Sequence, residues 1–330
     1  MSKKILFTGA SGFIGSHFHK AINNTIITNL DLREPKFKHN ADYIKGDIRI
    51  KEDVEKAIEA SQPEVIVSLA AEHKDFGINR EDYFRTNEYG TQVICEAATK
   101  YGIKNIVFYS SVAVYGGNTE PSTEQMPPNP NLPYGESKLA GEKVLKKWAA
   151  EDASRSVLII RPSVVYGERN IANMFRLINQ IRAGRYFHIG KGDNVKSIVY
   201  VKNIVDATLF LMKQMKTGVD IYNYADEPQL TSREIASAIT ESLSKREPIT
   251  LPYWAVYTMG IPFDILIKWT GKDFPISTNR VKKFCTETYH KANKVLEAGF
   301  KPKYSTIDGL KNMVEWRNKE YKEDGNYFDV

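Results

Sequence analysis

A tyrosine and a lysine four residues apart, Tyr134 and Lys138, are the strongest candidates for chemistry in this sequence. The residues after them lack proline and repeat apolar side chains at helical spacing, which predicts a helix with both residues on one face. A free tyrosine has a pKa of about 10, and a nearby cation lowers it by favouring the phenolate. Such a tyrosine can accept the proton of an alcohol while another group accepts the hydride. The pair alone is weak evidence, because solvated helix faces often show the same spacing.

A glycine-rich turn near the start of the chain strengthens this interpretation. An apolar run over 5–8 is followed by glycines at every third position, Gly9, Gly12 and Gly15, and then by a helical pattern over 16–22. A turn of this kind brings backbone amides and a helix N-terminus close to a pyrophosphate. The alternative is a tight structural turn, but the flanking strand and helix favour dinucleotide binding.

An acidic residue at the end of the next strand indicates which dinucleotide binds. Asp31 follows the apolar run 25–30 and lies about 20 residues after the glycine turn, where a carboxylate accepts hydrogen bonds from an adenosine ribose. Because a carboxylate would repel a 2′-phosphate, we expect NAD rather than NADP. Arg33 argues in the other direction, since a nearby arginine can accommodate that phosphate.

Strand and helix patterns alternate through the first half of the chain. This alternation predicts an α/β fold with a Rossmann-type doubly wound parallel sheet. At 330 residues the chain is long enough for a smaller C-terminal α/β region as well. Ligands bind such sheets at the carboxyl ends of the strands, and Ser110 and Ser111 end the strand expected at 105–111. A proline-rich loop over 116–133 then leads to Tyr134 and is expected at the surface or as a lid.

Composition excludes several other classes of protein. The net charge of +6 is spread along the chain without an arginine-rich tract, so we expect no nucleic-acid partner. The two cysteines and six histidines lack metal-ligand spacing, which predicts free thiols and no metal. No apolar run is long enough for an integral membrane segment, and no signal peptide is evident. These features together predict a cytoplasmic protein.

Further motifs extend over nearly the whole chain, and together they are specific although no single one is. After the glycine turn and Asp31 come Asp47-Ile48, Ala70-Ala71, Asn87, Ser110 to Gly116, Tyr134-x-x-x-Lys138, Arg161 to Gly167, Gly190 to Asp193 and Ser197 to Ala207. With these motifs the sequence resembles the extended short-chain dehydrogenase/reductases. Within that superfamily it resembles the NAD-dependent sugar-nucleotide epimerase/dehydratase family, in particular UDP-hexose 4-epimerases.

The resemblance implies a catalytic triad of Ser111, Tyr134 and Lys138. Tyr134 would be the acid/base, Lys138 would lower its pKa and contact the nicotinamide ribose, and Ser111 would hydrogen-bond the substrate hydroxyl. The implied NAD-binding residues are Gly9, Gly12, Phe13, Ile14, Gly15, Asp31, Asp47, Ile48, Ala70, Ala71, Asn87, Tyr134, Lys138 and Pro162. The implied substrate-binding residues are Ser111, Val112, Tyr134, Val164, Lys196 and Arg280.

Departures from the family pattern help to choose a reaction. Dehydratases of the family carry acidic residues directly after the Ser/Thr, whereas Val112 and Ala113 stand here and cannot move a proton. This favours the simplest chemistry, in which a sugar hydroxyl is oxidised and the hydride returns to the opposite face. Val164 replaces a common asparagine and Lys196 a common arginine, and a lysine loses the bidentate fork. We therefore expect either that the nucleotide is held differently or that the substrate is unusual.

The chain is predicted to divide into an NAD-binding Rossmann domain over 1–165, to which 202–215 returns, and a mainly substrate-binding region over 166–330. The aromatic and apolar segment 251–271 is predicted to be a helical lid packed over that region. The alternative for this segment is an interfacial patch that docks on a membrane. The resemblance implies a homodimer formed by the helices around 83–100 and 134–150.

We therefore predict NAD-dependent epimerisation of a nucleotide sugar at C4 of a UDP-hexose or UDP-N-acetylhexosamine, through a 4-keto intermediate. One alternative is a net NAD(P)-dependent oxidoreductase acting on a keto-sugar or another secondary alcohol. The other is a non-enzymatic dinucleotide sensor, although such proteins usually lose the tyrosine or the lysine.

Overall fold

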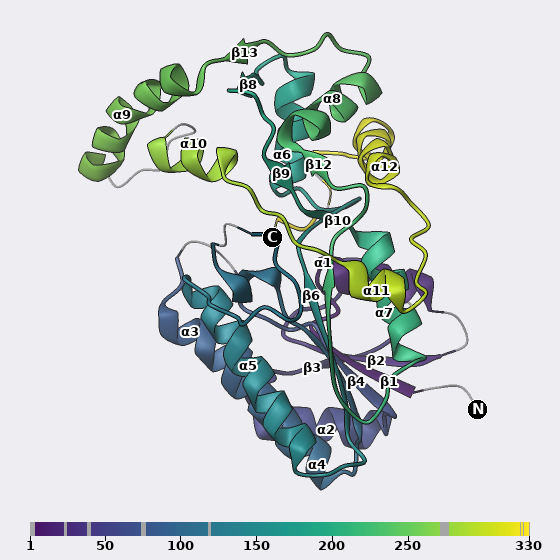
Figure 1. Ribbon diagram of the computed structural model, residues 1–330. Coiled ribbons are helices and arrows are strands. Elements are labelled where there is room, and N and C mark those ends of the chain that lie inside the picture. Colours follow the sequence, from purple (N-terminus) through teal and green to yellow (C-terminus); the bar gives the residue numbers. More distant parts are fainter. Residues whose placement is uncertain are drawn as a thin grey trace.

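The computed structural model describes residues 4–22, 25–37, 41–73, 77–117, 120–270, 277–323, 325 and 327–329. A large body built on one sheet lies below a smaller region in Figure 1, and the chain crosses between them several times. No helix within these ranges is long and apolar enough to cross a bilayer.

The body contains the predicted sheet, and all seven of its strands are parallel. In sheet order these are β11 (Gly218–Tyr224), β6 (Ser156–Pro162), β5 (Asn105–Tyr109), β4 (Val65–Ser68), β1 (Lys4–Thr8), β2 (Ile26–Asp31) and β3 (Asp42–Lys45). The order reverses direction between β1 and β4, which places a topological switch point beside the glycine turn. The predicted doubly wound α/β fold is confirmed.

Helices cover both faces of this sheet. They are α1 (Phe13–Ala21), α2 (Lys51–Ser61), α3 (Arg80–Phe84), α4 (Gly90–Lys100), α5 (Pro133–Ala150), α7 (Val201–Met212) and α11 (Asn293–Glu297). The single helix predicted over 83–100 is instead interrupted by a π-helical turn, η1 (Arg85–Tyr89). A 3₁₀ turn, η2 (Val112–Tyr115), follows β5.

Strand side chains alternate between two cores. Ile5 and Phe7 point to the side covered by α1, α7 and α11, whereas Leu6 and Ile66 point to the side covered by α2, α4 and α5. Because both faces of the central strands are buried, β1, β4, β5 and β6 are mostly apolar, as expected for a parallel sheet.

The upper region has its own core of buried apolar side chains. Its helices include α6 (Asn173–Arg182), α8 (Ser232–Ser242) and α12 (Thr306–Lys319), and its short strands are β7 (Val164–Tyr166), β8 (His188–Ile189), β9 (Val195–Lys196), β10 (Ile198–Tyr200), β12 (Leu230–Thr231) and β13 (Thr250–Leu251). Capping boxes begin α8 at Thr231 and α12 at Ser305.

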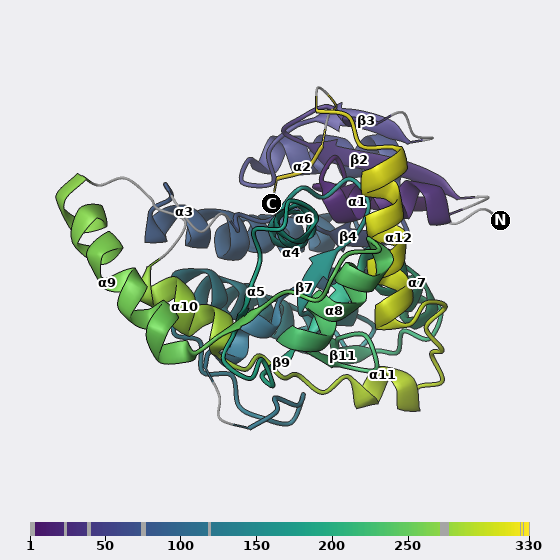
Figure 2. The ribbon, with the colours of Figure 1, turned by 90° about the horizontal axis from the view of Figure 1, so that it is seen from above.

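Two further helices, α9 (Tyr253–Thr270) and α10 (Thr278–Cys285), extend away from the body in both views (Figures 1 and 2). The prediction of a lid packed over the upper region is wrong for most of α9, because Trp254 is 71% exposed and Trp269 83% exposed. Residue 271, the last of the segment singled out in the sequence, lies outside the described residues, as do 272–276.

Candidate active site

Helix α5 positions the tyrosine and lysine as the sequence predicts. It begins at Pro133, whose fixed φ suits the first helical position, and Tyr134 and Lys138 follow one turn apart. Tyr134 is half-buried, and its ring centroid lies 6.3 Å from that of Tyr83 on α3. Lys138 is buried, so this side of α5 faces the protein and not bulk solvent.

A glycine brings the third predicted catalytic residue to the start of this helix. A Cβ at Gly135 would lie 2.3 Å from the carbonyl oxygen of Ala113, so only a glycine allows α5 to pack this closely on η2. Ser111 is the N-cap of η2, and its hydroxyl accepts a hydrogen bond from the Ala113 amide at 3.1 Å. Ser111 and Tyr134 therefore flank one point of backbone contact, with Val112 between Ser111 and Ala113.

Burial changes the acidity of the lysine. It lowers the pKa of Lys138 to about 7, because an ammonium loses hydration inside the protein, and the charge of Glu142 one turn later opposes this shift. The Lys138 Nζ also lies 4.2 Å from the ring centroid of Phe108. The amine of Lys138 can therefore gain or lose a proton near neutral pH.

Glu142 is the centre of a buried polar network that the sequence reasoning missed. Its carboxylate accepts two hydrogen bonds from the Arg161 guanidinium, at 2.8 and 2.5 Å, and one from the Ser110 hydroxyl at 2.6 Å. Glu142 and Arg161 are 0% and 1% exposed. The network joins α5, which carries Lys138, to β6 and to Ser110, the residue directly before Ser111. The only available signal was Arg161, a charge at the end of the apolar run 157–160.

The network continues toward the upper region. The third Arg161 nitrogen, Nη1, donates to the Tyr115 hydroxyl at 2.7 Å, and that hydroxyl donates to the Asn223 side-chain oxygen of β11 at 2.8 Å. The Tyr115 ring stacks on His290, with ring centroids 6.2 Å apart. The end of the sheet and the segment before α11 are thus tied to the turn that contains Ser111.

The Glu142→Gln variant should lower the free energy of unfolding by about 3 kcal/mol, because it leaves the Arg161 charge buried without a full counter-charge. Urea denaturation would measure the change. Glu151→Gln is the matched control, since that carboxylate is 54% exposed beside Arg155 and should cost under about 1 kcal/mol. Equal losses in the two variants would contradict a structural role for the buried pair.

His290 should make the fold sensitive to acid. Burial lowers its pKa from 6.5 to about 4, so between these values the unfolded chain binds a proton that the folded chain does not. Stability is therefore lost as the pH falls from 6.5 towards 4. The His290→Gln variant should lose about 3 kcal/mol less than wild type over this range, measured by urea denaturation at several pH values. Parallel pH dependences in the two proteins would show that His290 does not contribute.

The glycine turn has the geometry of a pyrophosphate site. Gly9 has φ +78°, and a Cβ there would lie 2.5 Å from the Ala70 backbone; a Cβ at Gly15 would lie 2.3 Å from Ala10. Gly12 is the N-cap of α1 and leaves its first turn without a side-chain cap or an acidic residue. The uncapped amides of this turn fit the diphosphate of a dinucleotide. Phe13 and Ile14 begin this helix.

Asp31 ends β2 beside this turn. One carboxylate oxygen accepts a hydrogen bond from the Ser11 amide at 3.0 Å, and the other accepts from the Arg33 amide at 3.0 Å. Asn29 supports the same loop by accepting from the Ala10 amide at 2.9 Å. The acidic residue predicted to bind the adenosine ribose therefore lies against the glycine turn, at the carboxyl end of its strand.

The other predicted NAD-binding residues lie at the carboxyl edge of the sheet. Asp47 and Ile48 follow β3, Ala70 and Ala71 follow β4, Asn87 lies in η1, and Pro162 ends β6. Burial would raise the pKa of Asp47, but its hydrogen bonds from Arg49 outweigh this and hold it below the usual value.

Asn87 is buried and ties three elements together. Its side chain accepts from the Glu72 amide at 3.0 Å and donates to the Glu72 carbonyl and the Ser137 hydroxyl, each at 2.9 Å. It therefore holds the loop after β4 against α5, next to Lys138.

The predicted substrate residues of the upper region are less tightly grouped. Val164 begins β7 and is 56% exposed, and Arg280 is exposed on α10. The Lys196 ammonium donates to the carbonyl oxygens of Lys283 and Thr286, so it ties β9 to the end of α10. The structure thus places Lys196 beside the helix of Arg280.

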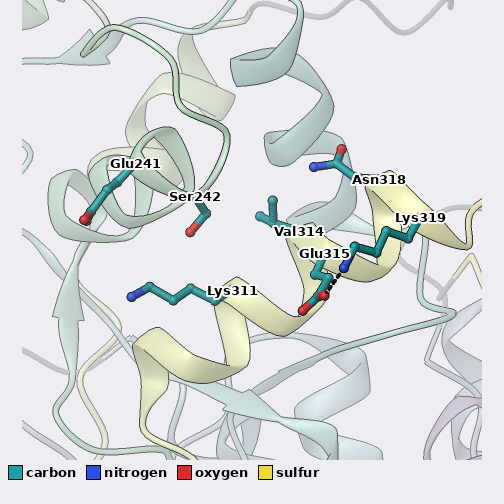
Figure 3. Close-up of a pocket in the computed structure, with 7 residues that line it drawn as sticks. All are labelled: Glu241, Ser242, Lys311, Val314, Glu315, Asn318 and Lys319. Carbon is teal, nitrogen blue, oxygen red and sulfur yellow. Dashed lines mark hydrogen bonds and ion pairs between the residues drawn. The ribbon is translucent and has the colours of Figure 1, made fainter.

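A surface pocket of about 480 Å³ lies elsewhere, between α8 and α12 (Figure 3). Its lining includes Glu241, Lys311, Glu315 and Lys319, and Lys319 pairs with Glu315 one turn earlier on the same helix. It contains none of the predicted site residues, and its mixed charges line an exposed junction of two helices. Within the described residues, no cluster of three or more His, Cys, Asp or Glu could hold a metal ion.

Comparisons with known proteins agree with this geometry. Residues 5–225 match the profile of the NAD dependent epimerase/dehydratase family. The chain is 38% identical to the N-acetyl-α-D-glucosaminyl-diphospho-ditrans,octacis-undecaprenol 4-epimerase of Escherichia coli O157:H7, over 98% of each chain. It is 26% identical to the UDP-glucose 4-epimerase of Bacillus subtilis, over 74% of this chain and 83% of that one. The fold matches the Thermus thermophilus UDP-glucose 4-epimerase complex with NAD, with a TM-score of 0.75, 22% identity, and coverage of 96% and 99%.

Proposed function

Because this chain belongs to the NAD dependent epimerase/dehydratase family, and so is an NAD-dependent enzyme, we propose that it inverts C4 of an N-acetylhexosamine carried on a diphosphate. The observation that carries the proposal is the 38% identity, over nearly the full length, to a 4-epimerase whose sugar is linked through a diphosphate to undecaprenol. A polyprenyl diphosphate is accordingly the first carrier to test. A UDP-hexose or UDP-N-acetylhexosamine is the second, supported by the similarity to the Bacillus subtilis enzyme.

The residues around α5 support this chemistry. When bound, NAD supplies a hydride acceptor that also returns the hydride, so no net oxidation results. The Tyr134 phenolate would accept the proton of the 4-hydroxyl, and the same side chain would return a proton to that oxygen in the reverse step. The Ser111 hydroxyl would hold the sugar oxygen in place. A protonated Lys138 would favour the phenolate form of Tyr134.

The residues after Ser111 favour epimerisation over dehydration. Elimination of water needs an acid and a base beside the sugar ring, whereas Val112 and Ala113 carry no group that titrates. The glycine turn with its uncapped α1 would hold the NAD diphosphate, and Asp31 would hold the adenosine ribose. NAD retained in this way could serve repeated cycles.

The test is incubation of the purified protein, without added cofactor, with N-acetylglucosaminyl diphosphoryl polyprenol and with UDP-hexoses and UDP-N-acetylhexosamines. Proton NMR of the released or intact sugars would report inversion at C4. An epimer without added cofactor is the expected result, and the preferred carrier identifies the substrate. If conversion requires stoichiometric NAD or NADH, the protein is a net oxidoreductase and the epimerase proposal fails.

A further inference from the structure

Helix α9 is apolar on the side that packs on the protein and also on the side that faces away from it. Its buried residues are Val256 and Gly260, and a Cβ at Gly260 would lie 2.8 Å from the backbone nitrogen of Thr278. The start of α10 therefore packs directly on this inner side. A helix at the surface of a water-soluble protein normally has a polar outer side, and α9 does not.

The outer side of α9 carries an apolar stripe that only the exposed Thr258 interrupts. Trp254, Ile261, Ile265 and Trp269 follow one another at steps of seven, four and four residues, which places them on one face of the helix. They are 71%, 45%, 53% and 83% exposed. Both views show α9 projecting from the body beside α10, so the described part of the chain leaves this stripe uncovered (Figures 1 and 2).

The charges near the stripe are mostly positive. Helices α9 and α10 carry four cations, Lys268, Arg280, Lys282 and Lys283, and one carboxylate, Asp264. Asp264 is turned toward α10, where it accepts hydrogen bonds from the Thr278 amide and hydroxyl. The helix pair therefore combines an apolar outer side on α9, next to Lys268, with a cationic α10.

This combination fits one partner in particular, the surface of an anionic membrane. Tryptophan side chains favour the boundary between headgroups and acyl chains, and lysines beside them extend to the headgroups while anionic lipids attract their charge. A helix of this type lies in the plane of the interface and does not cross it. A folded protein partner with a complementary acidic and apolar groove would be a less general match to a convex helix.

We propose that the helix pair α9–α10 docks the enzyme on an anionic phospholipid bilayer. There it would present the active site to a sugar carried in the membrane on a polyprenyl diphosphate, and this second part rests on the proposed function. Lys196 supports the connection, because its hydrogen bonds tie the end of α10 to β9. The docking surface and a predicted diphosphate-binding lysine are thus parts of one packed unit.

The direct test is flotation of the full-length protein with vesicles of phosphatidylcholine alone or with about one-third phosphatidylglycerol, at low and high salt. Wild type should float with the anionic vesicles, and less at high salt. The Trp254→Glu/Trp269→Glu variant should reduce the bound fraction at least about tenfold. The Lys282→Glu/Lys283→Glu variant should reduce the binding and its salt dependence.

A matched pair of single variants tests whether the stripe itself, and not any exposed apolar residue, binds the vesicles. Ile265→Glu in the stripe and Ile26→Glu at the start of β2 change residues that are 53% and 48% exposed, and only the first should reduce flotation. Absence of wild-type binding to anionic vesicles, or unchanged binding of Trp254→Glu/Trp269→Glu, would overturn the proposal. A second copy of the chain could cover the stripe instead of a membrane, and light scattering without vesicles tests this. A wild-type dimer that dissociates in the α9 variants would mean that a second copy covers the stripe, which would also overturn the proposal.

Activity assays separate this inference from the proposed function. The α9 variants should convert a water-soluble, short-chain diphosphate-linked sugar at the wild-type rate, but a long-chain substrate in vesicles at least about tenfold more slowly. If no substrate is epimerised while the wild type still floats, the proposed function fails and the docking surface stands. If the soluble substrate is converted and the wild type does not float, the docking proposal alone fails.

Discussion

Replacing Tyr134 with phenylalanine should lower kcat about 1,000-fold, the largest effect expected of any single change in this protein. The substitution removes one oxygen atom and keeps the ring that lies 6.3 Å from Tyr83. No other titrating group precedes Lys138 on the same face of α5, and Ser111 cannot replace the base because its hydroxyl is far less acidic than a tuned phenol. The proton of the sugar hydroxyl would then have to leave through water.

Single-turnover and steady-state assays of C4 inversion would measure this loss, together with the amount of NAD retained by the purified protein. The retained NAD is measured because Tyr134 is also a predicted NAD-binding residue, and the rates are compared per molecule of NAD-loaded protein. Tyr89→Phe makes the same chemical change on η1 at a residue that is 49% exposed, and it should keep wild-type activity. Activity of Tyr134→Phe within tenfold of wild type would assign the base to another residue.

The sheet and the catalytic helix could be predicted because their signals are local. Residues 5–8 and 105–109 form strands that are buried on both faces, so their apolar runs identify them without reference to distant parts of the chain. Gly15 is required by a close contact with Ala10 five residues earlier, and Gly9 by its own positive φ, although the contact of Gly9 with Ala70 is distant in sequence. Pro133 and the helical spacing after it fix where Tyr134 and Lys138 lie.

The buried network could not be predicted, because its partners are far apart in sequence. Glu142 meets Arg161 across 19 residues and Ser110 across 32, and Tyr115 meets Asn223 across 108. Each polar residue alone resembles an exposed helix position or a strand end. Only the packing of α5 on the sheet shows that the carboxylate and the guanidinium neutralise each other inside the protein.

The exposure of α9 could not be predicted for a different reason. An apolar helix has the same sequence pattern whether its partner is a protein core, a second copy or a lipid surface. Pro262, Asp264 and Lys268 interrupt the apolar pattern, but none of them determines which side of the helix is covered. The exposed Trp254 and Trp269 side chains decide this, and they turn an ambiguous pattern into a defined surface.

Lys138→Met should lower kcat/KM about 100-fold near neutral pH. The apparent pKa at which kcat/KM increases should also become higher by about one unit or more. The physical reason is the charge that the variant removes. A protonated Lys138 favours the Tyr134 phenolate, so without it the phenol needs a higher pH to ionise. Because burial lowers the Lys138 pKa to about 7, this support is strongest below that pH and weakens above it.

The shift in the pH profile distinguishes an electrostatic role for Lys138 from a structural one. A variant that only loosened α5 would lose activity equally at every pH, whereas loss of the cation changes the apparent pKa of the base. Lys143→Met is the matched control, because it removes an exposed cation from the same helix and should leave both the rate and the profile unchanged. Profiles of kcat/KM between pH 6 and 10 for the three proteins would decide. If Lys138→Met kept the wild-type profile at a reduced rate, Lys138 would act on NAD binding or on packing, and another group would have to tune Tyr134.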